Sequence, residues 1–300
     1  MKNYAIVREL RPQWNETETR ITELMGGLVN RSYLVETGEE ATTVRFPGRQ
    51  TGVYIDRQIE KINVGILAGV GIAPRVREFR EDGTMIRDFV RGTVATKESF
   101  KDPNVRLEAI KAIRQLHESS IQLCNRFDVF DKIREYRQLL NVYGPQMLQA
   151  AIDGELLIMI NRIEGALANR PRTTVPCHND LLPGNFVLTD YGTRIIDWEY
   201  AGMNDACYEI ANHITELDNL APEEEKHIMT LYFGENASRE QETVDMYKLP
   251  SRFLWALWAG IQYNISGLDF DFMGYAHHQF DRCSECVKLL ESEYPSLIHN

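Results

Sequence analysis

The sequence predicts an α+β fold with two lobes, a small strand-rich lobe at the N-terminus and a larger helical lobe at the C-terminus. Apolar and polar residues alternate, with turn residues between them, from about residue 21 to residue 95. From Pro103 onward the apolar residues follow helical spacing instead. The chain has 300 residues, of which 43% are hydrophobic, so it can bury a substantial core. We expect lobes of residues 1–90 and 91–300, joined by a hinge at residues 88–93.

The N-terminal lobe is expected to contain strands around one helix. The segments MGGLVNRSYLVET and ATTVRFPG alternate like strands, and a turn at Gly38-Glu39-Glu40 joins them. Residues 54–68 then show the spacing of a helix. A further hairpin runs through VREFREDGTMIRDFV, with Asp82-Gly83 at its tip.

The C-terminal lobe is expected to consist mainly of helices, with one polar cluster between them. No internal repeat or low-complexity segment interrupts the pattern. The expected helices are NVRLEAIKAIRQLHESS, FDKIREYRQLLNVY, QMLQAAIDGELLIMINRIEGALAN and residues 203–217, 222–233, 239–268 and 273–292.

The composition excludes several classes of protein. With 33 basic against 44 acidic residues the formal net charge is −11, which argues against a general nucleic-acid binder. The acidic balance suits a cationic substrate. No run of about 18 apolar residues predicts a membrane span, and the first residues lack the apolar core of a signal peptide. We therefore expect a cytoplasmic protein without membrane association; the sequence indicates nothing about its oligomeric state.

The cysteines do not predict a disulfide framework. There are five, an odd number for a chain of this size, so reduced thiols are the simpler interpretation. Cys283 and Cys286 form a C-x-x-C motif, but it lies in a helical pattern and no second pair completes a zinc site. We expect both to pack in the protein interior.

The segment CHNDLLPGNFVLTDYGTRIIDWEY carries polar residues among apolar strands. Asn185 and Asp197 each lie six residues from Tyr191, and Gly192 can take the positive φ of a turn. A regular hairpin would set the Asn185 amide and the Asp197 carboxylate side by side at its open end. Such oxygens are ligands for Mg²⁺, which completes its shell with water and phosphates. The segment therefore predicts a magnesium site.

Asp180 lies on the loop that leads into this hairpin. It could face an acceptor hydroxyl and act as base or orienting acceptor in phosphoryl transfer. The spacing His178-x-Asp180-x4-Asn185 followed by a metal-binding Asp is also the order of parts in a protein-kinase catalytic loop. His178 is expected to brace the loop by hydrogen bonds, and Cys177 has no activated context that would make it a nucleophile.

Phosphoryl transfer also needs a nucleotide site, and the chain lacks the glycine-rich loop of P-loop enzymes. The segment LMGGLVNRSYLVE offers Gly26 and Gly27 in a turn between strands, where bare backbone N–H groups can approach phosphates. Asn30 in the same segment is a further candidate for nucleotide contact.

Three other features of the N-terminal lobe are candidates for nucleotide binding. Arg45, on the strand TTVRF, lies where a kinase places its phosphate-binding lysine, and a guanidinium can contact phosphate oxygens in a bidentate way. Glu60, on the helix that follows, is its expected ion-pair partner. The hinge backbone from Asp88 through Phe89 to Val90 is expected to bind the adenine.

These motifs resemble the choline/ethanolamine kinase family, within the aminoglycoside-phosphotransferase-like small-molecule kinases, over nearly the whole chain. CHNDLLPGN and IIDWEY match its catalytic-loop and metal motifs, and VRFPG resembles its strand in which Arg replaces the protein-kinase Lys. NHITE, FLWALWAGIQ and FMGYA resemble its choline-pocket segments. The resemblance implies a protein kinase-like fold. Unlike protein kinases, the chain has Trp198-Glu199 after the metal Asp, and its glycine loop is short.

The resemblance also implies a pocket for a cationic headgroup. Trp255 and Trp258 are three residues apart on a helix and share a face, so their indoles could wall a quaternary ammonium. Tyr200 and Tyr275 would complete the cage by analogy with the family, and Glu216 would add a carboxylate. Without the resemblance, the Trp-x-x-Trp pattern is more typical of helix core.

We therefore predict an enzyme that uses ATP and Mg²⁺ to phosphorylate the hydroxyl of choline. Ethanolamine, thiamine or an aminoglycoside as acceptor would keep the same chemistry. A non-catalytic relative that binds a nucleotide is the alternative of a different class, although the presence of Asp180, Asn185 and Asp197 argues against it.

Overall fold

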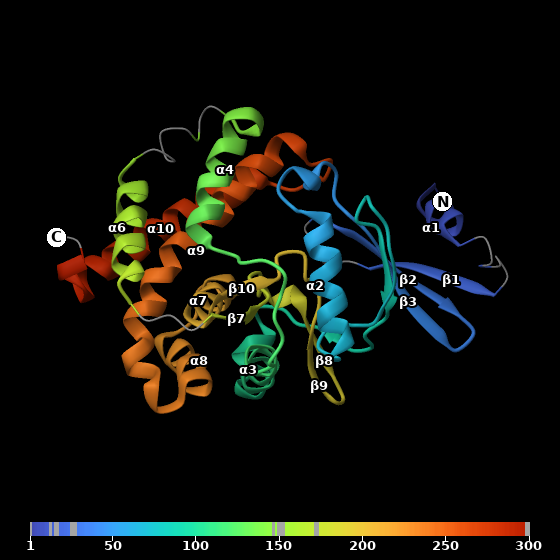
Figure 1. Ribbon diagram of the computed structural model, residues 1–300, viewed down its shortest axis with the longest axis horizontal. Helices are drawn as coiled ribbons and strands as arrows, with labels where there is room; N and C mark the ends of the chain where they lie inside the picture. The colour runs from blue at the N-terminus through green and yellow to red at the C-terminus, as the bar shows by residue number, and fades with distance from the viewer. Residues whose placement is uncertain are drawn as a thin grey trace.

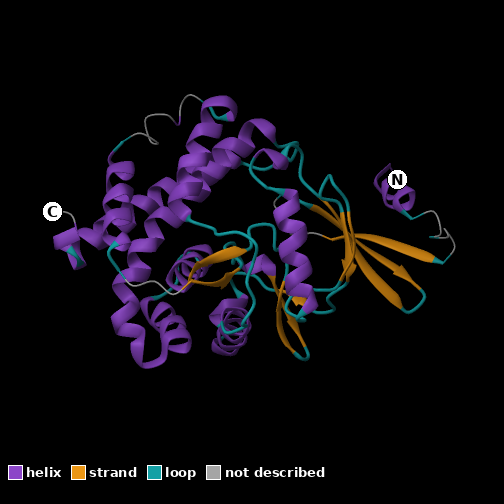
Figure 2. Ribbon diagram, viewed as in Figure 1, coloured by secondary structure: helices purple, strands orange, loops and turns teal. Residues whose placement is uncertain are grey.

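The computed structural model describes residues 2–11, 14, 18–24, 29–145, 148, 154–170 and 174–297. A sheet with one long helix forms one side of the molecule, and the other side is built mainly of helices (Figures 1 and 2). The predicted two-lobed α+β fold is thus confirmed. The predicted boundary at residue 90 falls just after the last strand of the N-terminal sheet.

The N-terminal sheet is antiparallel throughout. Val35 and Val44 are among the side chains that point to one face and are buried there, as the alternation in sequence predicts. The turn between Thr37 and Glu40 has Gly38 at φ 60°, and the Asp82-Gly83 hairpin has Gly83 at φ 89°. In spatial order the strands are β1 (Thr19–Leu24), β2 (Arg31–Thr37), β3 (Glu40–Phe46), β5 (Met85–Asp88) and β4 (Val76–Phe79).

Two helices accompany this sheet. Helix α1 (Lys2–Leu10), which the sequence analysis did not predict, lies at the outer side of the sheet and buries Val7 against it (Figure 1). Helix α2 (Arg57–Gly69) stands between the sheet and the helical lobe. It begins three residues later than predicted because the Asp56 carboxylate caps it, accepting from Gln58 N at 2.9 Å and Ile59 N at 3.1 Å.

The helices of the C-terminal lobe agree with the predicted order, with two differences. Residues 203–205 were predicted as helix but form a strand, because Asp205 caps the helix that follows by accepting from Cys207 N. The predicted helix at 146–169 is described only from Glu155, after Gly154; residues 146–147 and 149–153 lie outside the described part. The helices are α3 (Pro103–His117), α4 (Val129–Tyr143), α6 (Glu155–Ala168), α7 (Ala206–Leu217), α8 (Pro222–Phe233), α9 (Ala237–Ile265) and α10 (Phe272–Glu293).

Two small antiparallel sheets carry the polar cluster between these helices. One pairs β7 (Thr174–Cys177) with β10 (Gly202–Asp205). The other has the order β6 (Thr93–Val94), β8 (Phe186–Thr189) and β9 (Gly192–Ile195). Since β6 pairs with β8, residues 93–94 belong to the same small sheet as the hairpin of the polar cluster.

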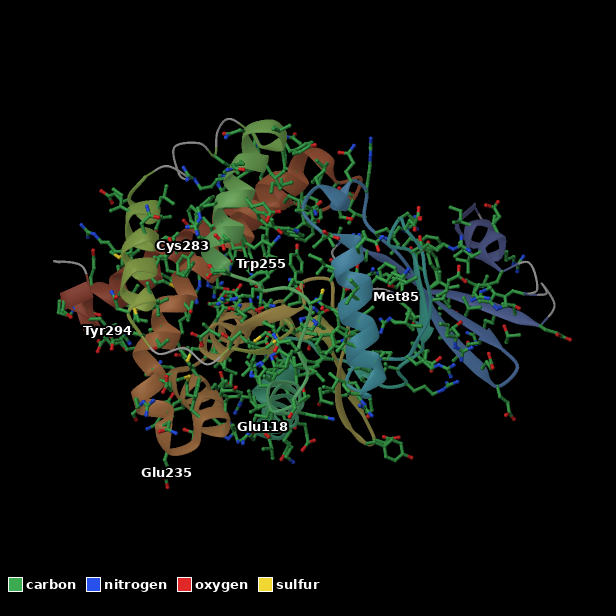
Figure 3. The ribbon with its side chains drawn as sticks, in the orientation of Figure 1. Met85, Glu118, Glu235, Trp255, Cys283 and Tyr294 are labelled. Atoms are coloured by element: carbon green, nitrogen blue, oxygen red, sulfur yellow. The ribbon has the colours of Figure 1, made fainter. Side chains whose placement is uncertain are left out.

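All five cysteines are free thiols. Cys283 is fully buried and its thiol lies 3.9 Å from Leu249 O, as expected for packing (Figure 3). Within the described residues, no helix is both long and apolar enough to cross a membrane.

Candidate active site

The polar cluster forms around the hairpin of β8 and β9, whose register differs from the predicted one. Phe186 pairs with Ile195, so the turn is centred between Asp190 and Tyr191 rather than on Tyr191. Ile196 N therefore donates to Asn185 O at 2.9 Å, and Asp197 lies one residue further along, with φ 68°. The predicted pairing of Asn185 with Asp197 is wrong by one residue. The left-handed backbone turns Asp197 out of the strand, and both side chains still line one cavity.

The side chains of this cavity offer oxygen atoms to a cation. Asn185 Nδ2 donates to Asp180 O at 2.8 Å, which fixes the amide beside the loop that carries Asp180. The Asp197 carboxylate is partly exposed and accepts weakly from Asn30 Nδ2 at 3.3 Å and Arg45 Nη1 at 3.2 Å. An amide oxygen beside a carboxylate fits the ligand preference of Mg²⁺.

Asp180 lies in the same cavity in an environment that favours its protonated form. Burial, followed by the nearby carboxylates of Glu216, Asp197 and Glu199, raises the pKa of Asp180 well above its ordinary value. A carboxylate with a raised pKa is a better proton acceptor, so the site can support general base chemistry at Asp180.

Helix α7 holds the backbone on both sides of Asp180. Glu209 accepts from His178 N at 3.0 Å and from Asn179 N at 2.5 Å. Asn212 Oδ1 accepts from Leu181 N at 2.8 Å, and His213 Nδ1 lies 3.2 Å from Leu181 O. Of the NHITE segment, Asn212 and His213 therefore hold the catalytic loop, while Thr215 and Glu216 line the cavity. The resemblance had implied that the whole segment belongs to the substrate pocket.

Glu209 is itself held from behind by a buried histidine. His117 Nε2 lies 2.7 Å from Glu209 Oε2, and His117 Nδ1 lies 2.5 Å from Tyr232 Oη. Burial acts to raise the pKa of Glu209, but the hydrogen bonds from His117 and from the loop lower it overall. Cys177 lies 3.6 Å from His117, where burial raises the pKa of its thiol well above the ordinary value. His117, Cys177 and Glu209 could hold a metal by their spacing. The carboxylate, however, is already occupied by hydrogen bonds.

His178 braces the loop from its other end. Its Nε2 lies 2.9 Å from Ile196 O, and its ring packs on Trp198 with centroids 4.6 Å apart. Burial lowers the pKa of His178, so the neutral ring donates to the strand that precedes Asp197.

Next to the catalytic groups, the cavity of 260 Å³ is walled by aromatic rings. Tyr200 and Trp255 have centroids 5.3 Å apart, Trp255 and Trp258 6.2 Å, and Trp258 and Tyr275 5.9 Å. Each pair is close to perpendicular, so the indoles form a corner rather than two parallel walls. Trp255, on α9, lies on the side of the helical lobe that faces α2 (Figure 3).

Two glutamates also line the same cavity. Burial raises the pKa of Glu216 to about 7, against the lowering effects of Arg252 and Lys97. Burial, followed by Asp197, likewise raises the pKa of Glu199 to about 7. Glu199 entered the sequence analysis only as a departure from the protein-kinase motif, and its place in the cavity was not predicted.

The cavity also has an edge of basic residues that sequence reasoning missed. Lys97, Arg252 and His278 line it, and all three contact the Asp218 carboxylate, at 3.6, 3.0 and 3.0 Å. Asp218 has φ 53°, in the left-handed region that few non-glycine residues adopt. Its carboxylate offsets the positive charge at this edge.

A second cleft, of 190 Å³, opens on the other side of Asn185 and Asp197. Arg45 and Val90 line it, together with Asn30, which lines both spaces. Gly26 and Gly27, predicted beside it, lie outside the described residues. The N–H of Asp88 donates to Arg75 O and its carboxylate pairs with Arg77 at 2.6 Å, so an adenine contact through Asp88 would be made by its carbonyl. Phe89 N–H donates to Ala41 O at 3.2 Å.

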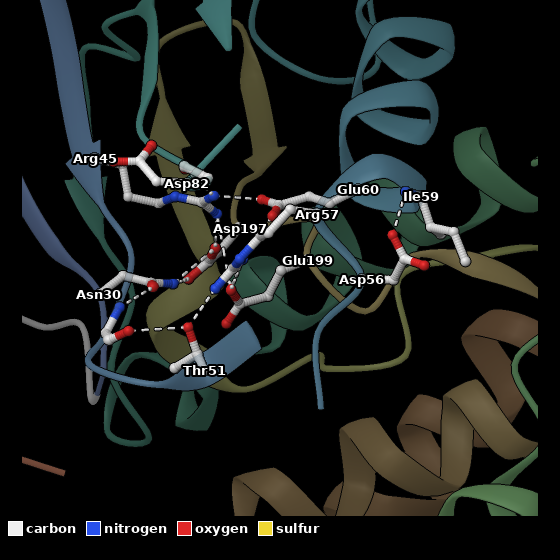
Figure 4. A network of polar contacts seen from close by, with 12 residues as sticks. Asn30, Arg45, Thr51, Asp56, Arg57, Ile59, Glu60, Asp82, Asp197 and Glu199 are labelled. Atoms are coloured by element: carbon white, nitrogen blue, oxygen red, sulfur yellow. Dashed lines mark hydrogen bonds and ion pairs between the residues drawn. The ribbon is translucent and has the colours of Figure 1, made fainter. Parts of the chain in front are cut away.

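Arg45 and Glu60 form the predicted ion pair, within a larger network that joins the lobes (Figure 4). Burial acts against the charge of Arg45, but Glu60, Asp197 and Glu199 raise its pKa, so it stays charged. Arg57, which was not predicted, pairs with Glu60 at 2.6 Å and Glu199 at 3.0 Å.

The comparisons with known proteins agree with this geometry. The sequence model of choline/ethanolamine kinase matches residues 21–229. The chain belongs to the choline/ethanolamine kinase family. It is 27% identical to human ethanolamine kinase 2, over 92% of this chain and 78% of that protein.

Solved structures show the same fold. A choline/ethanolamine kinase family protein from Mesorhizobium loti has a TM-score of 0.79 at 28% identity, covering 99% of this chain and 96% of the other. The choline kinase LicA from Streptococcus pneumoniae has a TM-score of 0.83 at 24% identity, covering 96% and 99%, and has also been solved in complex with AMP.

As a member of this family, the chain is a kinase that phosphorylates the alcohol group of an amino alcohol. The site has the parts that this chemistry needs: a carboxylate that can take a proton, oxygen ligands for a cation, and a walled cavity beside them. The predicted family, fold and enzyme class are confirmed.

Proposed function

We propose that this protein transfers the γ-phosphate of ATP to the hydroxyl of choline, with Mg²⁺, and gives phosphocholine. One observation supports the proposal above others: the polar cluster and the corner of aromatic rings line one and the same cavity. The cavity residues that carry this argument are Asp180, Asn185, Asp197, Tyr200, Trp255, Trp258 and Tyr275.

In this mechanism Asp180 accepts the hydroxyl proton as the choline oxygen bonds to the γ-phosphorus and the bond to ADP breaks. Asn185 and Asp197 would hold Mg²⁺, which neutralises charge on the phosphates. Arg45 lines the nucleotide cleft and stays charged, so its guanidinium would place positive charge beside the phosphates. Asn30 adds an amide at the junction of the two spaces.

Choline is proposed as acceptor because a quaternary ammonium has no N–H to donate and is bound by aromatic faces and nearby negative charge. Trp255 and Trp258 supply the faces, and Glu216 supplies the charge. Ethanolamine is the second candidate, since Glu199 and Glu216 can accept hydrogen bonds from a primary ammonium. The name of the human relative favours it as well.

A coupled assay of ADP release with Mg·ATP tests the proposal against choline, ethanolamine, thiamine and kanamycin. Choline should give the highest kcat/KM, and Trp255→Ala should lower kcat/KM for choline about tenfold more than for ethanolamine. Asp180→Asn should abolish turnover. A wild type that favours ethanolamine would overturn the choline assignment; turnover of none of the four would overturn the function.

A further inference from the structure

Arg57 occupies an unusual position for an arginine. It is the first residue of α2, where the helix dipole disfavours positive charge, so other contacts must hold it there. Nη1 lies 2.6 Å from Glu60 Oε2 and 3.0 Å from Glu199 Oε2, and Nη2 donates to Thr51 Oγ1 at 2.5 Å (Figure 4). Its two terminal nitrogens therefore reach three acceptors on three segments.

The carboxylates that Arg57 joins belong to different parts of the site. Glu60 pairs with Arg45, which faces the nucleotide cleft and contacts Asp197. Glu199 lines the acceptor cavity. Arg57 thus connects Glu60 of α2, which orients Arg45 at the nucleotide cleft, to the loop with Glu199, which lines the acceptor cavity.

The hairpin of β4 and β5 has a glycine where Arg57 packs. A Cβ on Gly83 would lie 2.7 Å from Arg57 Cδ and 2.8 Å from its Nε. Gly83 O also accepts from Arg45 Nη2 at 3.1 Å. The hairpin tip therefore closes over both guanidinium groups, and any side chain there would displace Arg57.

We propose that Arg57 is a positioning residue for phosphoryl transfer: it fixes Glu199 at the acceptor cavity and, through Glu60, fixes Arg45 at the nucleotide cleft. A lysine cannot replace it, because one ammonium cannot reach Thr51, Glu60 and Glu199 in the same planar arrangement. The inference rests on the proposed kinase activity and adds to it a residue that touches neither substrate.

Steady-state kinetics of Arg57→Met and Arg57→Lys test the proposal, with the better of the two amino alcohols as acceptor. Because a displaced catalytic group costs about a hundredfold, kcat should fall by about that factor in both variants. The acceptor KM should rise in both. Arg77→Met is the matched control, since Arg77 also pairs with two carboxylates, Glu40 and Asp88, but at the surface. It should stay within about twofold of the wild type.

A double-mutant cycle separates positioning from general destabilisation. If Arg57 acts through Glu199, the effects of Arg57→Met and Glu199→Gln on kcat/KM should be strongly non-additive, whereas Arg57→Met and Trp258→Phe should be additive. Guanidinium added at millimolar concentration should restore part of the kcat of Arg57→Ala, a result that loss of folding would not give.

Gly83→Ala provides a variant that keeps every charge. It should lower kcat in the same direction as Arg57→Met. If the wild type turns over an amino alcohol but Arg57→Met and Gly83→Ala keep its kcat and acceptor KM, or the cycle with Glu199→Gln is additive, the inference is overturned while the kinase function stands. A wild type without turnover overturns the proposed function instead.

Discussion

Arg45 Nη1 lies 3.2 Å from Asp197 Oδ1, across the junction of the two lobes. The arginine comes from β3 and the carboxylate from the loop after β9, so the contact forms only when both lobes are in place. Arg45 is 2% exposed, and its charge is balanced on the other side by Glu60. The residue that faces the nucleotide cleft thus also holds the carboxylate proposed for Mg²⁺.

Arg45→Met should therefore impair nucleotide use and stability together. Loss of the guanidinium leaves the buried Glu60 with Arg57 alone, and breaking a buried pair costs about 3–5 kcal/mol. We expect the KM for Mg·ATP to rise about tenfold or more, since one lost contact of about 1.4 kcal/mol has that effect. Initial rates against ATP and urea unfolding measure the two effects. An unchanged KM for Mg·ATP would contradict the role of Arg45 at the phosphates.

Glu209→Gln should slow catalysis without a direct contact to substrate. The carboxylate accepts from His178 N, Asn179 N and His117, and an amide would set an N–H group against one of these donors. Each buried donor left unpaired costs about 1–3 kcal/mol, and the displaced loop should lower kcat about tenfold or more. Glu225→Gln, at the Lys248 pair, is the matched control. Equal kcat for both variants would contradict the bracing role.

The cavity carboxylate Glu216 predicts a pH dependence of acceptor binding. Its pKa is raised to about 7, mainly by burial, with Asp218 raising it and Arg252 and Lys97 lowering it. Below pH 7 the group is neutral and attracts a cation weakly, so the acceptor KM should fall as pH rises from 6 to 8. Glu216→Gln should raise KM at pH 8 and flatten this difference. A variant that keeps the wild-type profile would assign the dependence to another group.

The same shift predicts a stability effect of opposite sign. Between the unfolded value of 4.5 and about 7 the folded protein binds more protons than the unfolded one, so stability falls as pH rises through this window. Glu216→Gln should therefore raise the free energy of unfolding at pH 8 by at most about 3 kcal/mol, a limit that solvent screening lowers. At pH 4.5 the substitution should change the free energy of unfolding little. Urea unfolding at both pH values measures this. A variant less stable than the wild type at pH 8 would show that Glu216 is ionised in a favourable pair.

How much the sequence could predict depends on how local each feature is. The Arg45–Glu60 pair was predictable because α2, which carries Glu60, is the next long element after β3, which carries Arg45. The Trp255–Trp258 contact was predictable because residues three apart share one face of a helix. The predicted register of the hairpin was wrong by one residue, because the segment DYG can form either a two-residue or a three-residue turn. The adenine contact of Asp88 stays a prediction, and the structure narrows it to the carbonyl because the N–H donates to Arg75 O within the N-terminal lobe.

Features that join distant segments could not be read in this way. Asp218 contacts Lys97, Arg252 and His278, which come from three separate parts of the chain, and no spacing in the sequence predicts these contacts. The position of Arg57 in the sequence carries one signal: a positive charge at the start of a helix is unfavourable and therefore indicates a tertiary partner.

Asp218→Asn should weaken binding of cationic acceptors specifically. Asparagine keeps the shape and tolerates a positive φ, so the substitution removes charge without adding backbone strain. Lys97 and Arg252 would then face the cavity without their shared counter-charge, and the acceptor KM should rise about tenfold, the effect of about 1.4 kcal/mol. The uncharged choline isostere 3,3-dimethylbutan-1-ol provides the control, because its binding does not depend on the charge of the cavity. The inhibition constants of this alcohol for the wild type and the variant should agree within about twofold, well below that charge effect. If its binding weakens as much as that of choline, Asp218 shapes the cavity rather than balancing its charge.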